Sequence, residues 1–394
     1  MPDPRNSRPT IIHLVHERIG AVGGIQRFDL RTVRALAEIA AERQWDLQVI
    51  SFDGVTPGVD LPPQVQFRSA NGRRWRLLSM LAGVCLRRNV KEIFIGHLRL
   101  AKMSWPVLAA FPRTRRLLFV HGIEAWHPGR SRIYRFASRT VVNRFIDDVI
   151  SVSRFTVKRM HAAMQTQGPR LHLLPNALDV DETILAAPRG SSAGDGPALL
   201  SVARMDRHDM PKGIPAALRA VATLTREFPQ LRYRIVGDGE LRKTHEALAQ
   251  QLGIASHVQF LGRISDVQLT AVYAASDIFL LPSTKEGFGI VFLEAWFAGL
   301  PIVCGNIDAS AEVVENGVDG FAVPPDDPAV IAAAVATLLK DQQLAEQFVI
   351  NGRQKLLARY SHIRFIEKLR AIASNTHQTI EHPASGIGGL EDPT

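Results

Sequence analysis

Two glutamates separated by seven residues are the clearest candidates for chemistry in the sequence. Glu286 and Glu294 enclose the run G-F-G-I-V-F-L, directly after the apolar stretch Ile278–Leu281 and a short polar turn. The glycines beside Phe288 predict a helix that begins near Gly289, and a helix amino end presents unpaired N–H groups and a positive dipole to an anion. If most of the segment is helical, its rise of about 10 Å is roughly the reach from a sugar to a ribose across a diphosphate. One carboxylate could then accept hydrogen bonds from sugar hydroxyls and the other from ribose hydroxyls.

Spacing alone favours a simpler interpretation of the two glutamates. Glu286 would be an acid at a helix start, stabilised by the helix dipole, and Glu294 an ordinary surface residue. A second candidate for chemistry is the segment S-V-A-R-M-D-R-H-D-M-P-K-G, residues 201–213. Arg204 could hold a diphosphate through its planar fork and Lys212 could do so as a point charge. Two solvated surface cations are the alternative.

The elements that must position these residues follow an alternating pattern of short β-branched runs and longer helical patterns. Such alternation predicts parallel sheets with crossover helices, in which ligands bind at the carboxyl ends of the strands. His97, His121, Ser153 and Asn176 all fall at such ends. The predicted strands of the first half are Ile11–Val15, Leu47–Phe52, Glu92–Ile95, Leu117–Val120, Asp148–Val152 and Leu171–Leu174. Those of the second half are Ala198–Val202, Arg232–Val236, Val258–Leu261, Ile278–Leu281, Ile302–Cys304 and Phe321–Val323.

The run A-A-P-R-G-S-S-A-G-D-G-P, residues 186–197, loses all periodicity and predicts a domain boundary. We therefore expect a Rossmann-like domain over residues 1–185 and a second over 198–360. A helix over 361–374 is expected to return to the first domain, and residues 375–394 to form a flexible tail.

Composition fits a soluble α/β protein of two domains. The chain has 394 residues, of which 46% are hydrophobic and 22% charged. Its two cysteines, Cys85 and Cys304, are far apart, which argues against a disulfide framework or a structural zinc site, and no H-E-x-x-H pattern occurs. We expect no metal site built by protein ligands alone. The polar start and the absence of a long apolar run predict a cytoplasmic protein.

Charge is distributed unevenly along the chain. Residues 1–185 hold 28 Lys and Arg against 15 Asp and Glu, whereas the remainder holds 19 against 23. The segment Arg68–Arg159 is the most basic, with 20 against 4. Such an excess suggests nucleic acid or an anionic membrane leaflet as partner, with a solubilising arginine-rich surface as the simpler alternative. Within it, residues 73–88 could form a helix that lies on a membrane with Trp75 at the interface, or a core helix with arginines at both ends.

The run E-G-F-G-I-V-F-L-E, followed by A-G-L-P-I-V, resembles the hallmark of glycosyltransferase family 4. In that family the first glutamate contacts the donor sugar, the second contacts the ribose, and the amides between them contact the sugar and phosphates. The resemblance assigns these roles to Glu286, to Glu294, and to Phe288, Gly289 and Ile290.

Other segments resemble landmarks of the same family. Its R-L…K-G pattern matches Arg204 and Lys212, although Met205 replaces the commoner leucine and the loop between the cations is longer. V-Q-F-L-G-R-I is similar to the family's base-binding strand and loop, which makes Arg263 and Ile264 neighbours of the nucleobase, with simple packing as the alternative for Ile264. The G-G loop after the first strand corresponds to Gly23 and Gly24, facing the donor phosphates. His121, in F-V-H-G-I-E-A-W, corresponds to a histidine near the donor sugar.

The resemblance implies a GT-B fold, with two Rossmann-like domains and a donor cleft between them. The implied reaction is retaining transfer of a hexose, mannose being one candidate, from a GDP- or UDP-sugar to an acceptor hydroxyl. Arg204, Lys212 and the helix amino end would stabilise the leaving diphosphate, so no cofactor is expected and metal should be dispensable. With the basic first domain, this suggests a lipid-linked acceptor in bacterial exopolysaccharide or lipopolysaccharide assembly, at the inner face of the plasma membrane.

Two other classes of protein remain open from the sequence. A nucleotide-sugar epimerase shares the GT-B architecture. A nucleic-acid-binding protein would explain the charge, but no recognisable binding motif accompanies it and only four tyrosines are present to help stack bases.

Overall fold

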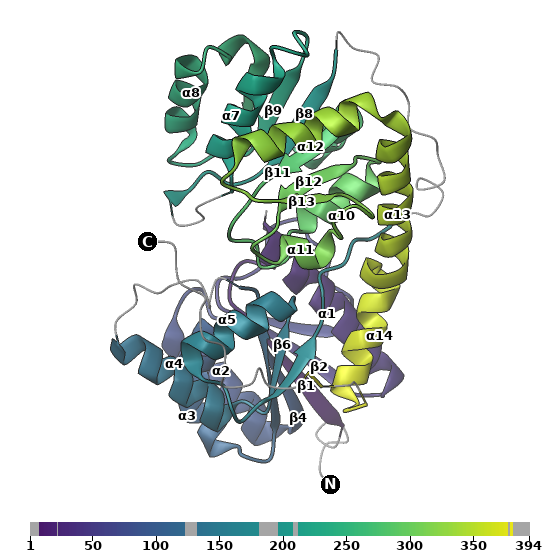
Figure 1. The fold of residues 1–394 in the computed structure, drawn as a ribbon. Coiled ribbons are helices and arrows are strands. Elements are labelled where there is room, and N and C mark those ends of the chain that lie inside the picture. The colour runs from purple at the N-terminus through teal and green to yellow at the C-terminus, as the bar shows by residue number, and fades with distance from the viewer. Residues whose placement is uncertain are drawn as a thin grey trace. The chain divides into compact units, whose positions relative to one another are not determined.

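A computed structural model describes residues 8–21, 23–122, 132–180, 196–207, 212–376 and 379–380. The chain divides into two compact units (Figure 1). The first comprises Met1–Pro175 and Ile366–Thr394, and the second comprises Asn176–Phe365. The division after Pro175 precedes the predicted boundary at residue 185. Most of the linker predicted over residues 186–197 lies outside the described residues.

The first unit contains a seven-stranded parallel sheet in the order β3-β2-β1-β4-β5-β6-β7. The chain runs outward from β1 to one edge and then returns to build β4–β7 on the other side of β1. The strands are β1 (Pro9–Val15), β2 (Asp46–Ser51), β3 (Val65–Ser69), β4 (Asn89–Ile95), β5 (Arg115–Val120), β6 (Asp148–Ser151) and β7 (Arg170–Leu173).

Sequence reasoning missed β3. This edge strand pairs only with β2, and its side chains alternate between half-buried and exposed. The run V-Q-F-R-S therefore lacks the continuous apolar character that marks the buried strands of a parallel sheet.

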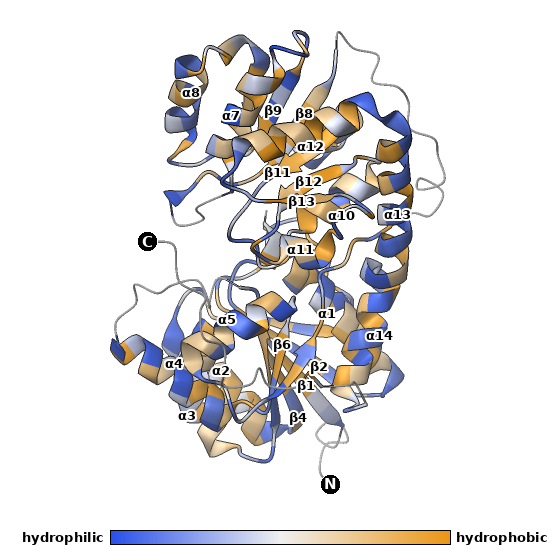
Figure 2. Cartoon of the chain, in the orientation of Figure 1, coloured by the Kyte–Doolittle hydropathy of each residue, from blue (hydrophilic) through white to orange (hydrophobic). Residues whose placement is uncertain are grey.

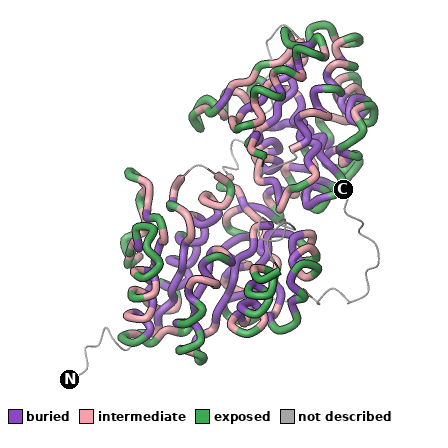
Figure 3. Tube along the Cα trace, turned by 90° about the vertical axis from the view of Figure 1, so that its left-hand side faces the viewer, coloured by how far each residue is buried: buried purple, intermediate pink, exposed green. Residues whose placement is uncertain are grey.

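Four helices pack on one face of the first sheet and share one hydrophobic core with Ile12 and Leu14 of β1. They are α2 (Arg74–Arg87), α3 (Leu98–Ala110), α4 (Arg132–Phe145) and α5 (Arg154–Met164). The alternate residues of the sheet face α1 (Gly24–Glu42), where the rings of Phe28 and Phe119 meet edge to face at 5.3 Å. Figures 2 and 3 show the result, with apolar, buried strands beneath helices whose outer turns are polar and exposed.

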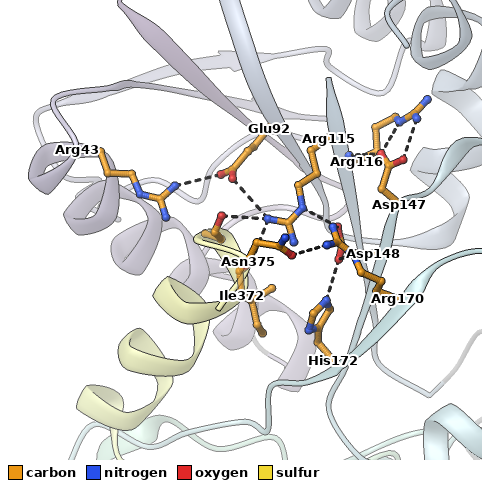
Figure 4. A network of polar contacts seen from close by, with 11 residues as sticks. Arg43, Glu92, Arg115, Arg116, Asp147, Asp148, Arg170, His172, Ile372 and Asn375 are labelled. Atoms are coloured by element: carbon orange, nitrogen blue, oxygen red, sulfur yellow. Dashed lines mark hydrogen bonds and ion pairs between the residues drawn. The ribbon is translucent and has the colours of Figure 1, made fainter. Parts of the chain in front are cut away.

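Helix α14 (His362–Ala373) belongs to the first unit from Ile366 onward and lies beside α1, where Arg370 pairs with Glu42 at 2.6 Å. Its carboxyl end is held by Arg115 at the start of β5. The Arg115 guanidinium donates to the carbonyl oxygens of Ile372 and Ala373, each at 3.0 Å (Figure 4). A cation at this place satisfies carbonyls that no helical N–H reaches.

The same guanidinium belongs to a buried network of charges at the amino ends of the strands (Figure 4). Arg115 donates to Asp148 at 2.7 Å, and Asp148 also meets Arg170 and His172. Burial acts to raise the pKa of Asp148, but the hydrogen bonds from His172, Arg115 and Arg170 hold it well below its usual range. Burial raises the pKa of Glu92 to about 6, despite Arg43 and Arg115 nearby.

The second unit contains a six-stranded parallel sheet in the order β10-β9-β8-β11-β12-β13. The strands are β8 (Ala198–Val202), β9 (Arg232–Val236), β10 (Val258–Gly262), β11 (Ile278–Leu281), β12 (Ile302–Gly305) and β13 (Phe321–Val323). Its helices are α7 (Ile214–Leu224), α8 (Arg242–Gln251), the 3₁₀ turn η3 (Ala255–His257), α9 (Asp266–Ala274), α10 (Ile290–Phe297), α11 (Ser310–Val313), α12 (Pro328–Lys340) and α13 (Gln342–Tyr360). Within the part of the chain that the structure describes, no helix is both long and apolar enough to span a bilayer.

Candidate functional site

The strand order of the second unit has its reversal between β8 and β11. In open parallel sheets, ligands bind at the carboxyl ends of the strands that flank such a point. The segment with Arg204 and Lys212 follows β8, and the loop with Glu286 follows β11. The two sequence segments predicted to hold the donor therefore leave the sheet on neighbouring strands.

Glu286 and Lys212 are in direct contact. The Lys212 ammonium donates to the Glu286 carboxylate with Nζ and Oε1 2.5 Å apart, and the two side chains are only 19% and 13% exposed. Sequence reasoning placed these residues on different parts of a donor and did not foresee that they form an ion pair. Because each charge is largely removed from water, each depends on the other for stabilisation.

A tight turn brings Glu286 to the start of α10. Gly289 caps the helix with φ +84°, and a Cβ atom at this position would lie 2.3 Å from the ring of Phe292. The helix begins at Ile290, one residue after the predicted start. Phe288 is buried, and its ring meets the ring of Tyr360 in a T-shaped contact with centroids 5.5 Å apart. The backbone from Phe288 to Ile290 is thus fixed by packing at the amino end of α10.

Asp308, which sequence reasoning missed, anchors the Glu286 loop through hydrogen bonds. It is 3% exposed and accepts hydrogen bonds from the backbone N–H of Glu286 at 2.7 Å, from the hydroxyl of Ser283 at 2.8 Å, and from the N–H of Ser310 at 2.9 Å. Burial, together with the Glu286 carboxylate, raises the pKa of Asp308 to about 6. The only sequence signal was an aspartate a few residues past the end of the strand Ile302–Cys304.

Glu294 is the fifth residue of α10 and is half-buried. The hydroxyl of Tyr273 donates to its carboxylate at 3.0 Å, and the Tyr273 ring is buried and stacked on Phe279. Glu294 is therefore oriented by a rigid neighbour and is not the free surface glutamate of the simpler interpretation. Tyr273 was also missed, because nothing in α9 marks its hydroxyl as facing another helix.

Arg204 is exposed just after β8, and residues 208–211, between it and Lys212, lie outside the described residues. The neighbouring Met205 is buried and is held by backbone hydrogen bonds to Asp238 and Leu241, in the turn that begins with V-G-D-G at the end of β9. The Met205 N–H donates to Asp238 at 3.0 Å, and its carbonyl accepts from Leu241 at 2.8 Å. The V-G-D-G turn thus fixes the backbone that carries Arg204.

Arg263 and Ile264 follow the edge strand β10. Arg263 is exposed and Ile264 half-buried, and Ser265 then caps α9 in a capping box with Gln268. The carbonyl of Gly262 accepts from the N–H of Gly237 at 2.8 Å, which joins this loop to the turn after β9. Both predicted base-contacting residues therefore lie at the carboxyl end of the same sheet.

In the first unit, Gly23 and Gly24 form the start of α1, and the helix has no side-chain cap and no acidic residue in its first turn. The role predicted for its first N–H groups, contact with an anion, stays a prediction. The loop lies between β1 and α1, beside the strand-order reversal at β1 and β4.

His121 directly follows β5, where its Nε2 lies 3.1 Å from the carbonyl oxygen of Gly96 and its ring meets Phe28 at 4.8 Å. A ring nitrogen that faces a carbonyl carries its proton, so Nδ1 of neutral His121 is an acceptor. His16, directly after β1, lies against His97 with ring centroids 5.1 Å apart. Burial, with His97 and Arg99, lowers the pKa of His16 to about 4.

Two of the remaining strand-end residues cap helices. Ser153 caps α5 by accepting from the N–H of Thr156 at 3.1 Å, and His97 caps α3. Asn176 is the first residue of the second unit, and Asp179 faces His362 at 3.5 Å. Helix α2 is a core helix on its inner side, yet it leaves Trp75 exposed.

Comparisons with known proteins bear on both units. Residues 5–182 match the model described as Glycosyltransferase Family 4, and residues 187–355 match the model described as Glycosyl transferases group 1. The chain is 32% identical over 232 residues to a GDP-mannose-dependent alpha-(1-6)-phosphatidylinositol monomannoside mannosyltransferase of Mycolicibacterium smegmatis, which covers 55% of this chain and 60% of that protein. It is 32% identical over 195 residues to a phosphatidyl-myo-inositol mannosyltransferase of Mycobacterium tuberculosis, 48% of this chain and 50% of that protein. The chain thus matches only about half of the length of these relatives.

Solved structures resemble the chain over nearly its whole length. Anabaena HepE in complex with UDP and glucose has a TM-score of 0.71 at 20% identity and covers 92% of this chain and 99% of its own. Sucrose-phosphate synthase from Thermosynechococcus elongatus has a TM-score of 0.74 at 19% identity, covering 93% and 98%. At such identities the likeness shows a common fold.

Proposed function

We propose, from the premise that the chain belongs to the family 4 glycosyltransferases and has their GT-B fold, that it is a retaining hexosyltransferase. It would transfer a hexose from a nucleotide-diphosphate sugar to an acceptor hydroxyl. One observation carries the proposal. The Glu286–Lys212 pair lies beside the amino end of α10, at the strand-order reversal of the second unit. A donor there would meet a carboxylate for its hydroxyls, and a cation with helix N–H groups for its phosphates.

In this proposal each residue acts on a different part of the donor. Glu286 accepts hydrogen bonds from the sugar hydroxyls, and Glu294, oriented by Tyr273, accepts from the ribose hydroxyls. The amides of Phe288, Gly289 and Ile290 contact the sugar and phosphates. Arg263 and Ile264 border the base. By the family resemblance, Gly23 and Gly24 of the first unit would offer helix N–H groups to the phosphates, and His121 would contact the sugar.

The proposed chemistry retains the configuration of the anomeric carbon. The bond from that carbon to the phosphate oxygen breaks while the acceptor oxygen attacks from the same face, and the acceptor proton passes to the leaving diphosphate. Arg204, Lys212 and the amino end of α10 stabilise the charge that develops on this leaving group. A metal ion is dispensable in this proposal, because these cations act where a metal would.

The sugar, nucleotide and acceptor are chosen from the chemistry of the chain and its relatives. The similarity to proteins named as GDP-mannose-dependent or phosphatidylinositol mannosyltransferases favours mannose from GDP-mannose, with a UDP-hexose as the alternative. The basic first unit favours an acceptor that carries phosphate, such as a lipid-linked saccharide of exopolysaccharide or lipopolysaccharide assembly. The enzyme would then act in the cytoplasm, peripherally at the inner face of the plasma membrane.

A thermal-shift panel of GDP-, UDP- and ADP-sugars tests the donor site without knowledge of the acceptor. We expect one class to raise the melting temperature of the wild type. Glu286→Ala should nearly abolish transfer, and Glu294→Ala should mainly weaken donor binding. Glu346→Ala, at an exposed position of α13, is the matched control and should change neither. Turnover by Glu286→Ala at the rate of the wild type would refute the proposed function. Conversion of the donor without any acceptor would instead indicate an epimerase.

A further inference from the structure

The helix layer α2–α5 of the first unit carries charge of one sign only. It contains twelve lysines and arginines, three in α2, two in α3, four in α4 and three in α5, and no aspartate or glutamate. Helix α1, on the other face of the same sheet, has three basic and three acidic residues. Twelve of the 20 basic residues of the segment Arg68–Arg159 therefore lie in one layer of the unit and none of its four acidic residues does, which a general solubilising role does not explain.

The same layer exposes large apolar side chains. Helix α4 leaves Ile133 81% exposed and Phe136 71% exposed, although its buried side is already made by Ser138, Val141 and Val142. Figure 2 shows polar and apolar segments alternating along α4. Helices α2 and α3 add further exposed side chains to the layer, which are Trp75, Leu86 and Trp105. Apolar groups gathered among cations are unusual for a surface that meets only water.

The basic and apolar residues of α4 share a groove. Arg132, Arg135 and Arg139 follow one another at three- and four-residue spacing and so lie along one side of the helix. Together with α5 they border an open groove of about 500 Å³, which is lined by Arg132, Ile133, Arg135, Phe136, Arg139, Ala162, Ala163, Met164 and Gln165. Arginines beside apolar side chains suit the interface of a lipid bilayer, where phosphate groups lie above the hydrocarbon chains.

We infer that this α4 face is a docking surface for an anionic phospholipid bilayer. Ile133 and Phe136 enter the interfacial region of the bilayer, while Arg132, Arg135 and Arg139 contact lipid phosphates. Charge complementarity favours an anionic leaflet, and the exposed isoleucine favours lipid over nucleic acid, since an aliphatic side chain neither stacks on bases nor contacts phosphates. The inference rests on the proposed function in one respect, which is that the enzyme works at a membrane.

Sedimentation with vesicles tests the surface. Vesicles of phosphatidylcholine with about one-third phosphatidylglycerol should bind the full-length protein, and phosphatidylcholine alone should bind it weakly. The triple change Arg132→Gln, Arg135→Gln and Arg139→Gln should weaken the partition coefficient on the order of 100-fold. The pair Ile133→Ser and Phe136→Ser keeps every charge and should weaken it about tenfold. Val330→Ser with Ile350→Ser, exposed positions in the second unit, is the matched control and should bind as the wild type does.

Several results would overturn the inference. One is vesicle binding that the Ile133/Phe136 pair leaves unchanged, and another is binding to neutral vesicles as tight as to anionic ones. Tighter binding to a mixed-sequence oligonucleotide, equally insensitive to the apolar pair, would make the layer a nucleic-acid surface. Because all substituted side chains are exposed, melting temperatures should match the wild type. Thermal shift by the donor, measured in the same variants, reports the proposed function separately. Loss of the donor response with vesicle binding intact would refute only the function.

Discussion

Replacing Asp308 with asparagine tests whether the Glu286 loop rests on a buried, titrating carboxyl group. The Asp308 carboxylate accepts from Ser283, Glu286 and Ser310 through both of its oxygens. Asparagine keeps the shape but offers one oxygen, so at least one of the three donors loses its acceptor. A hydrogen bond of this kind is worth about 1 kcal/mol in the free energy of unfolding.

As the pH rises, the titration of Asp308 in the wild type should offset this loss in the free energy of unfolding. Burial and the Glu286 carboxylate raise the pKa of Asp308 from 3.8 to about 6. The folded state therefore binds this proton more tightly than the unfolded state, so the stabilisation is complete below about pH 4 and is lost as the pH rises to about 6. Two pKa units correspond to about 3 kcal/mol. Asparagine does not titrate, so Asp308→Asn should be about 1 kcal/mol less stable than the wild type at pH 4 and about 2 kcal/mol more stable at pH 7.

Urea denaturation of both proteins at half-unit intervals from pH 4 to pH 7 measures this difference. Other groups that titrate in the same range, such as Glu92 with its pKa of about 6, are present in both proteins and cancel. Asp326→Asn, at an exposed position, controls for the change of residue type. A difference between Asp308→Asn and the wild type that stays constant within about 0.5 kcal/mol across this range would refute the reasoning.

Three further predictions follow from the contacts of single residues. Arg115→Gln leaves buried carboxylates and the last carbonyls of α14 without their cation. It should lower the free energy of unfolding, measured in urea, by about 3–5 kcal/mol. A loss below about 1 kcal/mol would contradict the role of the network. Gly289→Ala places a side chain at φ +84° and 2.3 Å from the ring of Phe292, so it should lower the free energy of unfolding by more than about 2 kcal/mol and reduce donor binding. Gly58→Ala, with φ +81° and open space around the position, is the control and should lower the free energy of unfolding by about 1 kcal/mol. Equal losses in the two variants would contradict the role of the clash. Tyr273→Phe removes the hydrogen bond to Glu294 and should weaken donor affinity about fivefold to tenfold in calorimetry, so an unchanged affinity would separate Glu294 from the donor.

The sheet of the second unit was predictable because its central strands β8, β11 and β12 are short apolar runs that are almost wholly buried, and because its outer strands still carry apolar residues such as Val258, Phe260 and Phe321. Strands β8, β9, β11 and β13 have the predicted limits, and the two others extend by one residue. The edge strand β3 was not predictable in this way, since its exposed positions are polar and its partner lies on one side only. The hydrophobic pattern of a sequence indicates which residues are buried, and the side chains of β3 are at most half-buried.

The site was predictable where one segment carries its own signal. The glycine before α10 and the glutamates around it are local in sequence, and the helix starts next to the expected residue. Asp308 and Tyr273 could not be found, because their partners lie 22 and 21 positions away and the sequence contains no pattern that relates them. The contact of Lys212 with Glu286 spans 74 positions and arises only when β8 and β11 become neighbours.

The choice between a core helix and a membrane helix for α2 was not a true alternative. The helix buries Leu77, Leu81, Val84 and Cys85 and still exposes Trp75. A helix in an outer layer has two sides, and the inner side is sufficient for folding. The outer side can then serve another role. The sequence indicates such a role only where apolar residues interrupt the polar pattern of that side.

The Glu286 loop contains a contact that opposes folding. The carboxyls of Asp308 and Glu286 repel each other in a buried setting. A loop selected for stability alone would not keep this contact, since a neutral side chain at position 308 would remove the repulsion. Lys212 offsets part of it by pairing with Glu286. In the proposed function, a diphosphate bound at this place would compete for the same ammonium, so binding of the donor would require Lys212 to exchange partners. The sugar hydroxyls would then satisfy the Glu286 carboxylate, and recognition of the sugar would be linked to recognition of the phosphates.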